Sequence, residues 1–346
     1  METFSKNEKG DTEYLEQLKG GIDEKVGMLI KALDSESLPR IDGTVRVMEV
    51  GVGGGQGVEK IKRDIKDPDL EVYAIDILEP LVRRVHKPED KVFGVAANLT
   101  ALPFAERSFS AINVSAVIHE VISYNKDFLE GTVSVSDYLR EVFDKLTAHL
   151  TEGGRIFYRD VGLPDNSQEL LSGEYNPALI DFLKNFDSGF REKFLKVNQV
   201  SDEMWNIGEG AEAVASVHYH REMQRHVVSF LDYALLQKYG ESLKHILGEI
   251  ESGAYEQSRL ESAIQELGQE SFIFDAWQRR EGSEIYTYRS LGEMIEMVVS
   301  LSDEQKSLVI ESSESVERKE YSQFMDSMTN AGIRDTKQMM VIRRDN

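Results

Sequence analysis

The chain has 346 residues, 40% of them hydrophobic, so it is long enough to build one large core or two modest ones. It contains no cysteine, which excludes disulfides, thiolate nucleophiles and cysteine-based metal sites. A formal net charge of −22 disfavours binding to large nucleic acids, because Lys and Arg must neutralise their phosphates. No apolar run approaches the length of a membrane span and the first residues have no secretory character, so we expect a cytoplasmic protein.

Residues 1–40 are expected to form an N-terminal helical cap. Their apolar side chains recur at the spacing that one face of one or two helices requires. These side chains are Tyr14, Leu15, Leu18, Ile22, Val26, Leu29 and Ile30. Strand-like and helix-like runs then alternate over residues 41–162, which predicts a doubly wound α/β core.

The strongest local pattern is an apolar run that enters a glycine turn, VMEVGVGGG over residues 47–55. Glycine at Gly51, Gly53 and Gly55 gives the backbone access to unusual φ values and lets a ligand approach the main chain closely. The turn does not fit the G-x-G-x-x-G pattern of dinucleotide sites, because its third glycine is absent. The acid before the turn, Glu49, suits a cationic ligand better than a pyrophosphate.

Four further segments continue the alternation of elements. Residues 72–76, VYAID, form a β-branched and aromatic run that ends in an acid and predicts a strand. Residues 98–104, NLTALPF, and 108–114, SFSAINV, indicate a loop followed by a strand. Residues 150–158, LTEGGRIFY, indicate a turn and the next strand.

In this order, the five segments resemble those of the class I S-adenosylmethionine-dependent methyltransferases. The resemblance implies an α/β fold with a doubly wound seven-stranded sheet and S-adenosylmethionine as cofactor. It implies that Asp76 binds the ribose hydroxyls, since one carboxylate can accept two charge-assisted hydrogen bonds from a diol. Asn98 and Ser110 stand where the family commonly has Asp, and the Asn98 amide oxygen can still accept a hydrogen bond from adenine. The residues expected to bind the cofactor are Glu49, Gly51, Gly53, Gly55, Asp76, Ile77, Asn98, Leu99 and Ser115.

Residues 163–315 form an unusually long stretch that we expect to be a mainly helical insertion over the substrate site. Helical runs stand out at 223–239 and 243–250, and the charge runs at 249–261 and 311–320 are expected to be solvated helix faces. Residues 316–346 are expected to close the core with a helix over 321–333, stopped by a glycine, and a strand over 337–344.

Ligands of such sheets bind beyond the carboxyl ends of the strands, where His119, Tyr158 and Asp160 are the expected catalytic residues. His119 suits a general base near neutral pH, and the alternative is a histidine that packs or caps the pocket. Asp160 can orient an amine or accept its proton, and the alternative is an ion pair with Arg159 or a helix cap.

The substrate-binding prediction rests on a histidine-rich helix and on large aromatic side chains. His218, Glu222 and His226 recur at spacings of four and share one helix face, which fits a polar substrate, a metal ion or an ordinary exposed ion pair. Aromatic side chains can wall a substrate pocket or belong to the core. The residues expected to contact substrate are Tyr124, Tyr175, Trp205, His218 and Glu222, and no metal site is expected.

The cofactor motifs and the acidic balance together predict a methyltransferase that acts on a small molecule, without nucleic-acid or membrane partners. A homodimer and a monomer with a lid are both compatible with the insertion. One alternative transfers or cyclises the aminocarboxypropyl arm and releases methylthioadenosine, which needs the same nucleoside pocket. Another is a cofactor-binding scaffold without turnover. The intact Glu49, glycine turn and Asp76 argue against the scaffold.

Overall fold

The structure is a computed structural model in which part of the chain is described. The described residues are 21–124, 133–162, 170–174, 205–207, 212–256, 271–280, 289–303, 306–317 and 336–345, together with 258, 260, 262, 266, 282, 284 and 285. Within these ranges, no helix is both long enough and apolar enough to cross a membrane. The predicted helix over 321–333 and the first half of the predicted N-terminal cap lie outside the described residues.

A seven-stranded mixed sheet forms the centre of the molecule, with the strand order β3-β2-β1-β4-β5-β10-β9. The strands are β1 (Val45–Val50), β2 (Leu70–Asp76), β3 (Val92–Ala96), β4 (Phe109–Ser115), β5 (Leu150–Val161), β9 (Leu308–Glu317) and β10 (Thr336–Arg344). The first five pair in parallel, whereas β10 is antiparallel to both β5 and β9. This arrangement confirms the predicted doubly wound seven-stranded fold, including its closing strand.

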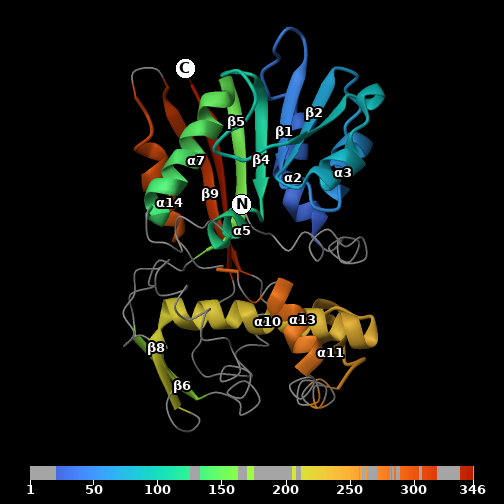
Figure 1. The fold of residues 1–346 in the computed structure, drawn as a ribbon, viewed down its shortest axis with the longest axis vertical. Helices are drawn as coiled ribbons and strands as arrows, with labels where there is room; N and C mark the ends of the chain where they lie inside the picture. Colours follow the sequence, from blue (N-terminus) through green and yellow to red (C-terminus); the bar gives the residue numbers. More distant parts are fainter. Residues whose placement is uncertain are drawn as a thin grey trace.

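Helices cover both faces of the sheet, as parallel strands require. One face packs against α2 (Ile22–Asp34), α3 (Gln56–Asp64) and α4 (Glu79–Val85), and a single 3-10 turn (Pro88–Asp90) leads into β3. The other face packs against α5 (Ile118–Ser123), α7 (Val135–His149) and α14 (Leu291–Val299). Figure 1 shows α7 and α14 on one side of the sheet and α2 and α3 on the other.

The alternation of side chains along β1 decides which residue faces which helix layer. Val47 packs in the core under α2 and α3, and its neighbour Met48 packs in the core under α5 and α7. Both side chains are fully buried. Glu49 lies two residues after Val47 and therefore also faces the α2 side. It is the second-last residue of β1, just before the glycine turn.

The insertion lies beyond the carboxyl ends of the parallel strands (Figure 1). Its described helices include α10 (Val217–Tyr239), α11 (Leu243–Glu251) and α13 (Ser271–Arg280), so the helical runs expected at 223–239 and 243–250 are confirmed. The insertion also contains an antiparallel sheet in the order β6-β8-β7, which the sequence analysis did not predict. These strands are β6 (Leu170–Glu174), β7 (Trp205–Ile207) and β8 (Glu212–Ser216).

Two charged segments differ from their predictions. Within the run 249–261, expected to be a helix face, α11 ends at Glu251 and residues 252–256 are not helical. The acidic run that begins at Glu311 was expected to be a helix face within the insertion, but residues 308–317 form β9 of the central sheet. Cross-strand ion pairs explain why an acidic run sits at this edge. The Glu311 carboxylate lies 2.6 Å from Arg155 Nε on β5 and 2.7 Å from Arg343 NH1 on β10. Pairing with β10 therefore overrides the apparent helical pattern.

Candidate functional site

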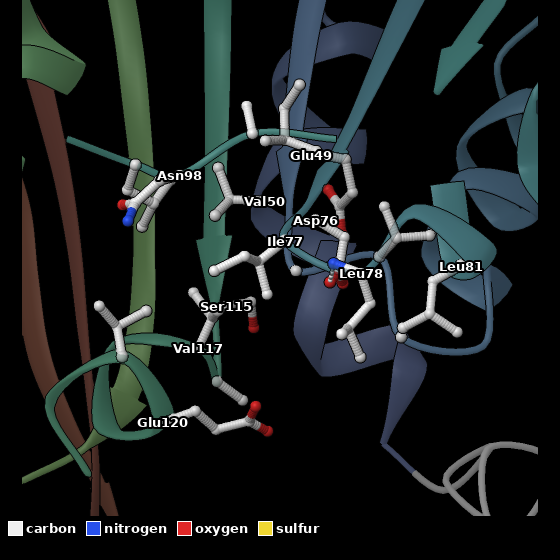
Figure 2. A pocket seen from close by; sticks show the side chains of 18 of the residues that line it. Glu49, Val50, Asp76, Ile77, Leu78, Leu81, Asn98, Ser115, Val117 and Glu120 are labelled. Atoms are coloured by element: carbon white, nitrogen blue, oxygen red, sulfur yellow. Dashed lines mark hydrogen bonds between the residues drawn. The ribbon is translucent and has the colours of Figure 1, made fainter. Parts of the chain in front are cut away.

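A cavity of about 520 Å³ opens at the carboxyl ends of β1, β2 and β4. Its walls come from the turns that follow these strands, from α5 and α7, and from the first turns of α2. Acidic side chains outnumber basic ones among its described lining residues. The acidic residues are Glu49, Asp76, Glu120 and Glu141, and the basic residue is Lys25. Figure 2 shows carboxylates reaching in from different strands and from α5. The cavity therefore favours a ligand that carries positive charge.

The glycine turn after β1 forms the floor of this cavity. Gly51 has a φ of +75°, a region that residues with side chains rarely adopt. A Cβ atom at Gly51 would lie 2.9 Å from the Val117 Cγ2 atom, in the turn that follows β4. The absence of a side chain at Gly51 thus lets the turns after β1 and β4 come into contact. Residues from both turns can therefore line the same cavity.

Glu49 lies in the wall of the cavity and is almost fully buried. Its Oε2 atom accepts a hydrogen bond of 2.9 Å from Asn113 Nδ2 on β4. A Cβ atom at position 57 would lie 2.8 Å from the Glu49 Oε1 atom, so a side chain there would displace the carboxylate. Burial raises the pKa of Glu49 to about 8, although the Asn113 hydrogen bond and the Lys25 charge act in the opposite direction. A cation in the cavity would favour the ionised carboxylate.

Asp76 stands at the end of β2 and Ile77 follows it in the cavity wall (Figure 2). The Asp76 carboxylate accepts the Leu78 N–H at 2.9 Å. Burial raises the pKa of Asp76, and backbone N–H groups from Leu78 and the glycine turn oppose this effect. Ile77 is 49% exposed, which is unusual for a large apolar side chain. A carboxylate beside an exposed apolar surface is suited to a sugar attached to a flat ring.

The predicted cofactor residues are brought together with one exception. Glu49, Gly51, Gly53, Asp76, Ile77, Asn98, Leu99 and Ser115 all line the cavity. Gly55 does not line it, and instead provides the left-handed residue that starts α3. The Asn98 Oδ1 atom accepts hydrogen bonds from the backbone N–H and the hydroxyl of Thr100, so it already has partners within its own loop.

The predicted catalytic residues lie behind the cavity wall, and His119 is not placed as a general base. Its Nδ1 atom is 2.7 Å from Asp160 Oδ1, and Asp160 Oδ2 also accepts the His119 backbone N–H at 3.1 Å. Burial alone would lower the pKa of His119, but the carboxylates of Asp160 and Glu284 outweigh it and raise that pKa to about 9. His119 therefore carries a proton at neutral pH. Asp160 holds the imidazolium in place, with its own pKa lowered by the same pairing despite burial.

Tyr158 and Glu222 are also remote from the cavity. Tyr158 is fully buried in the core and packs edge-on against Phe143, with ring centroids 5.7 Å apart. Glu222 is fully buried within the insertion, where its Oε1 atom lies 3.0 Å from His226 Nε2. The His226 ring packs on Trp277. The expected exposed helix face is thus a buried pair in the insertion core.

The remaining predicted substrate residues divide into two groups. Tyr124 lines the cavity at the end of α5. Tyr175 lies outside the described residues, and so do the side chains of Trp205 and His218, although their backbones belong to β7 and α10. Their roles stay predictions.

Three residues that the sequence analysis missed contribute to the site. Lys25 projects from α2 into the cavity, and burial lowers its pKa. Asn113 fixes Glu49, and Glu284 of the insertion contacts both His119 and Tyr124. A polar residue inside the apolar run of β4 was a usable signal for Asn113. Nothing in the local sequence marks Lys25 or Glu284, because their partners are far away along the chain.

Residues 48–157 match the model of a family described as a methyltransferase domain. The match runs from β1 to β5 and contains the glycine turn, Asp76 and the end of β4. The chain carries a class I S-adenosylmethionine-dependent methyltransferase domain. This finding agrees with the seven-stranded sheet and makes S-adenosylmethionine the cofactor.

Two solved structures are similar to this chain over most of its length. An S-adenosylmethionine-dependent methyltransferase from Mesorhizobium loti is 13% identical, with 94% of this chain and 100% of that chain covered and a TM-score of 0.44. The YcgJ protein from Bacillus subtilis is 12% identical, with 93% and 97% covered and a TM-score of 0.41. A search of curated proteins gives no match.

The residues of the methyltransferase domain suit its cofactor chemically. S-adenosylmethionine has a sulfonium and an ammonium group, which the acidic lining favours. Asp76 offers oxygen acceptors for the ribose hydroxyls, and the apolar side chains of Ile77 and Leu99 offer surface for adenine. Glu49 is separated from the glycine turn by one residue, lines the cavity, and could hold the ammonium.

Proposed function

We propose that this protein transfers the methyl group of S-adenosylmethionine to a small molecule, with the helical insertion covering the acceptor site. The observation that carries the proposal is the acidic cavity at the carboxyl edge of the sheet, together with the contact that the insertion makes beside it. The main-chain N–H of Ile285 donates to Ser123 Oγ at 2.6 Å, and Tyr124 donates to Glu284 at 3.2 Å. The insertion thereby reaches the helix that lines the cavity.

The size and charge of the acceptor follow from the same features. A cavity of about 520 Å³ lies in the range of small-molecule sites, and it has to hold the cofactor as well. The net charge of −22 gives no attraction for a nucleic-acid substrate. Methyl transfer itself needs few protein groups, since alignment with the sulfonium and exclusion of water account for much of it.

The test begins with calorimetric titration of the protein with S-adenosylmethionine and S-adenosylhomocysteine. Binding of both, lost in Asp76→Ala and partly retained in Asp76→Asn, is the expected result. Incubation with a metabolite extract and mass analysis then identifies the cofactor product. Formation of S-adenosylhomocysteine supports methyl transfer. Formation of methylthioadenosine would show aminocarboxypropyl transfer instead, and no binding at millimolar ligand would refute the proposal.

A further inference from the structure

The contact between Tyr124 and Glu284 joins the cofactor domain to the insertion at the cavity wall. Tyr124 is the residue that ends α5, and it lines the cavity. Its hydroxyl donates a hydrogen bond of 3.2 Å to Glu284 Oε1. Glu284 is 1% exposed and does not itself line this cavity. A phenol that lines the cavity and donates its hydroxyl proton to a buried carboxylate has the arrangement of a proton relay.

His119 stabilises this carboxylate and does not compete for the acceptor proton. Its Nε2 atom lies 3.7 Å from Glu284 Oε2, and its Nδ1 atom is bound by Asp160. The raised pKa of His119, about 9, places a positive charge beside the buried Glu284 carboxylate at neutral pH. His119 thus lies between the carboxylates of Asp160 and Glu284, and Glu284 Oε1 accepts the hydrogen bond of Tyr124.

Glu120 is the other acid that α5 turns toward the cavity, and its surroundings assign it to the cofactor side. Its charge acts on Asp76 at the end of β2 and on Lys25. Tyr124 lies one helical turn further along, where its backbone N–H bonds to the Glu120 carbonyl. Glu120 thus faces the part of the cavity where the ribose and the methionyl arm are expected, and Tyr124 faces outward toward the insertion.

We propose that Tyr124 removes the proton of the methyl acceptor by accepting it on its oxygen while passing its own hydroxyl proton to Glu284. The step rests on the proposed methyl transfer. The acceptor atom forms a bond to the methyl carbon, the carbon–sulfur bond breaks, and its electron pair stays on sulfur. The proton leaves the acceptor for Tyr124 Oη, and the Tyr124 proton goes to Glu284 Oε1. Tyr124 is the catalytic residue and Glu284 the positioning residue. The acceptor class is a hydroxyl or amine that keeps its proton at neutral pH.

A crystal structure of the complex with S-adenosylhomocysteine tests the geometry without any acceptor. We expect the open side of the sulfur to face the Tyr124 hydroxyl with room for one acceptor atom between them, and Tyr124 to remain bonded to Glu284. A complex in which the tyrosine points away from the sulfur would overturn the relay and leave the proposed function intact. Failure of S-adenosylhomocysteine to bind would instead overturn the proposed function.

Methyl transfer to two probe acceptors tests the chemistry. Phenol keeps its proton at about pH 8, whereas 4-nitrophenol is ionised and needs no base. We expect Tyr124→Phe and Glu284→Gln to slow transfer to phenol by about 100-fold or more and to leave transfer to 4-nitrophenol within a few-fold of wild type. Equal effects on both probes would overturn the relay.

Controls separate a relay from a structural effect. Tyr239→Phe and Glu251→Gln change the same residue types at exposed positions away from the cavity, and both should behave as wild type. Calorimetry of every variant with S-adenosylhomocysteine should give unchanged affinity. If the wild-type protein methylates neither phenol nor 4-nitrophenol, the position of Tyr124 in the S-adenosylhomocysteine complex is the test that decides whether the relay exists.

Discussion

The cofactor domain and the insertion both bury charged side chains, but they bury them in different places. In the cofactor domain, Glu49, Asp76 and Lys25 lie in the wall of a cavity at the ends of strands and at the start of a helix. In the insertion, Glu222 and His226 face each other in the middle of α10, enclosed by Trp277. A charge at the end of an element meets open backbone groups and a ligand, whereas a charge in the middle of a helix meets other side chains. For these residues, the charges at the ends of elements line the cavity and the pair within α10 does not, whereas the His119–Asp160 pair shows that an element's end can also hold a pair behind the cavity wall.

The largest expected effect is on cofactor binding at the end of β2. Asp76→Ala removes both acceptors for the ribose hydroxyls, and we expect the affinity for S-adenosylhomocysteine to fall by about 100-fold or more. The unfolding midpoint without ligand should change little. The cost of burying this carboxylate is offset by backbone hydrogen bonds, so removing the side chain removes both effects. Calorimetry and denaturant unfolding measure the two quantities. Unchanged affinity would contradict the comparison.

The next effect concerns His119, and pH reveals it. The pKa of about 9 in the folded protein lies above the ordinary value of 6.5. The stabilisation is therefore complete below about pH 6.5 and is lost as the pH rises through 9. We expect the free energy of unfolding to fall by about 3 kcal/mol across this window. His119→Gln should abolish this part of the pH dependence, and an unchanged profile in the variant would refute the assignment.

Glu222→Ala tests the insertion half of the comparison. The substitution leaves the buried His226 without its carboxylate partner, and we expect a loss of about 2 to 3 kcal/mol in the free energy of unfolding. Affinity for S-adenosylhomocysteine should stay at the wild-type value, because the pair lies outside the cavity. A variant that keeps its stability and loses a substrate would restore the original interpretation of Glu222 as a substrate residue.

Glu49 should report the arrival of positive charge in the cavity through a change in bound protons. With a pKa of about 8, the carboxyl is mostly protonated at pH 7 without ligand. A bound ammonium favours the ionised form, so binding of S-adenosylhomocysteine at pH 7 should release up to about one proton. Calorimetry in buffers of different ionisation enthalpy measures this number. Proton release that persists in Glu49→Gln would assign it to another group.

The smallest expected effect lies at the edge of the sheet. Glu311→Gln weakens the ion pairs with Arg155 and Arg343, which are partly exposed to solvent. We expect a loss of about 0.5 to 1 kcal/mol that shrinks as salt is added. Denaturant unfolding at low and high salt provides the measurement. A larger, salt-independent loss would mean that β9 depends on this carboxylate for its place in the sheet.

Much of the cofactor domain could be predicted because its signals are local. The glycine turn, the acid that ends β2 and the apolar strands are each set by backbone conformation or by residues near in sequence. The acidic edge strand β9 was misjudged because its partners, Arg155 and Arg343, lie on other strands. Glu284 was missed for the same reason, since the contact that gives it meaning spans 160 residues.

Through its resemblance to the class I methyltransferases, the sequence by itself predicted a doubly wound seven-stranded sheet, the cofactor, and eight of the nine expected cofactor residues that line the cavity. Short-range rules suffice for these features, because a strand that ends in a glycine turn presents its last side chains and its main chain to the same ligand. Only the tertiary structure decided the protonation of His119 and the partners of Tyr124 and Glu222. Those depend on which charges are brought within a few ångströms after burial, and electrostatic interactions at such distances carry no trace in the neighbouring sequence.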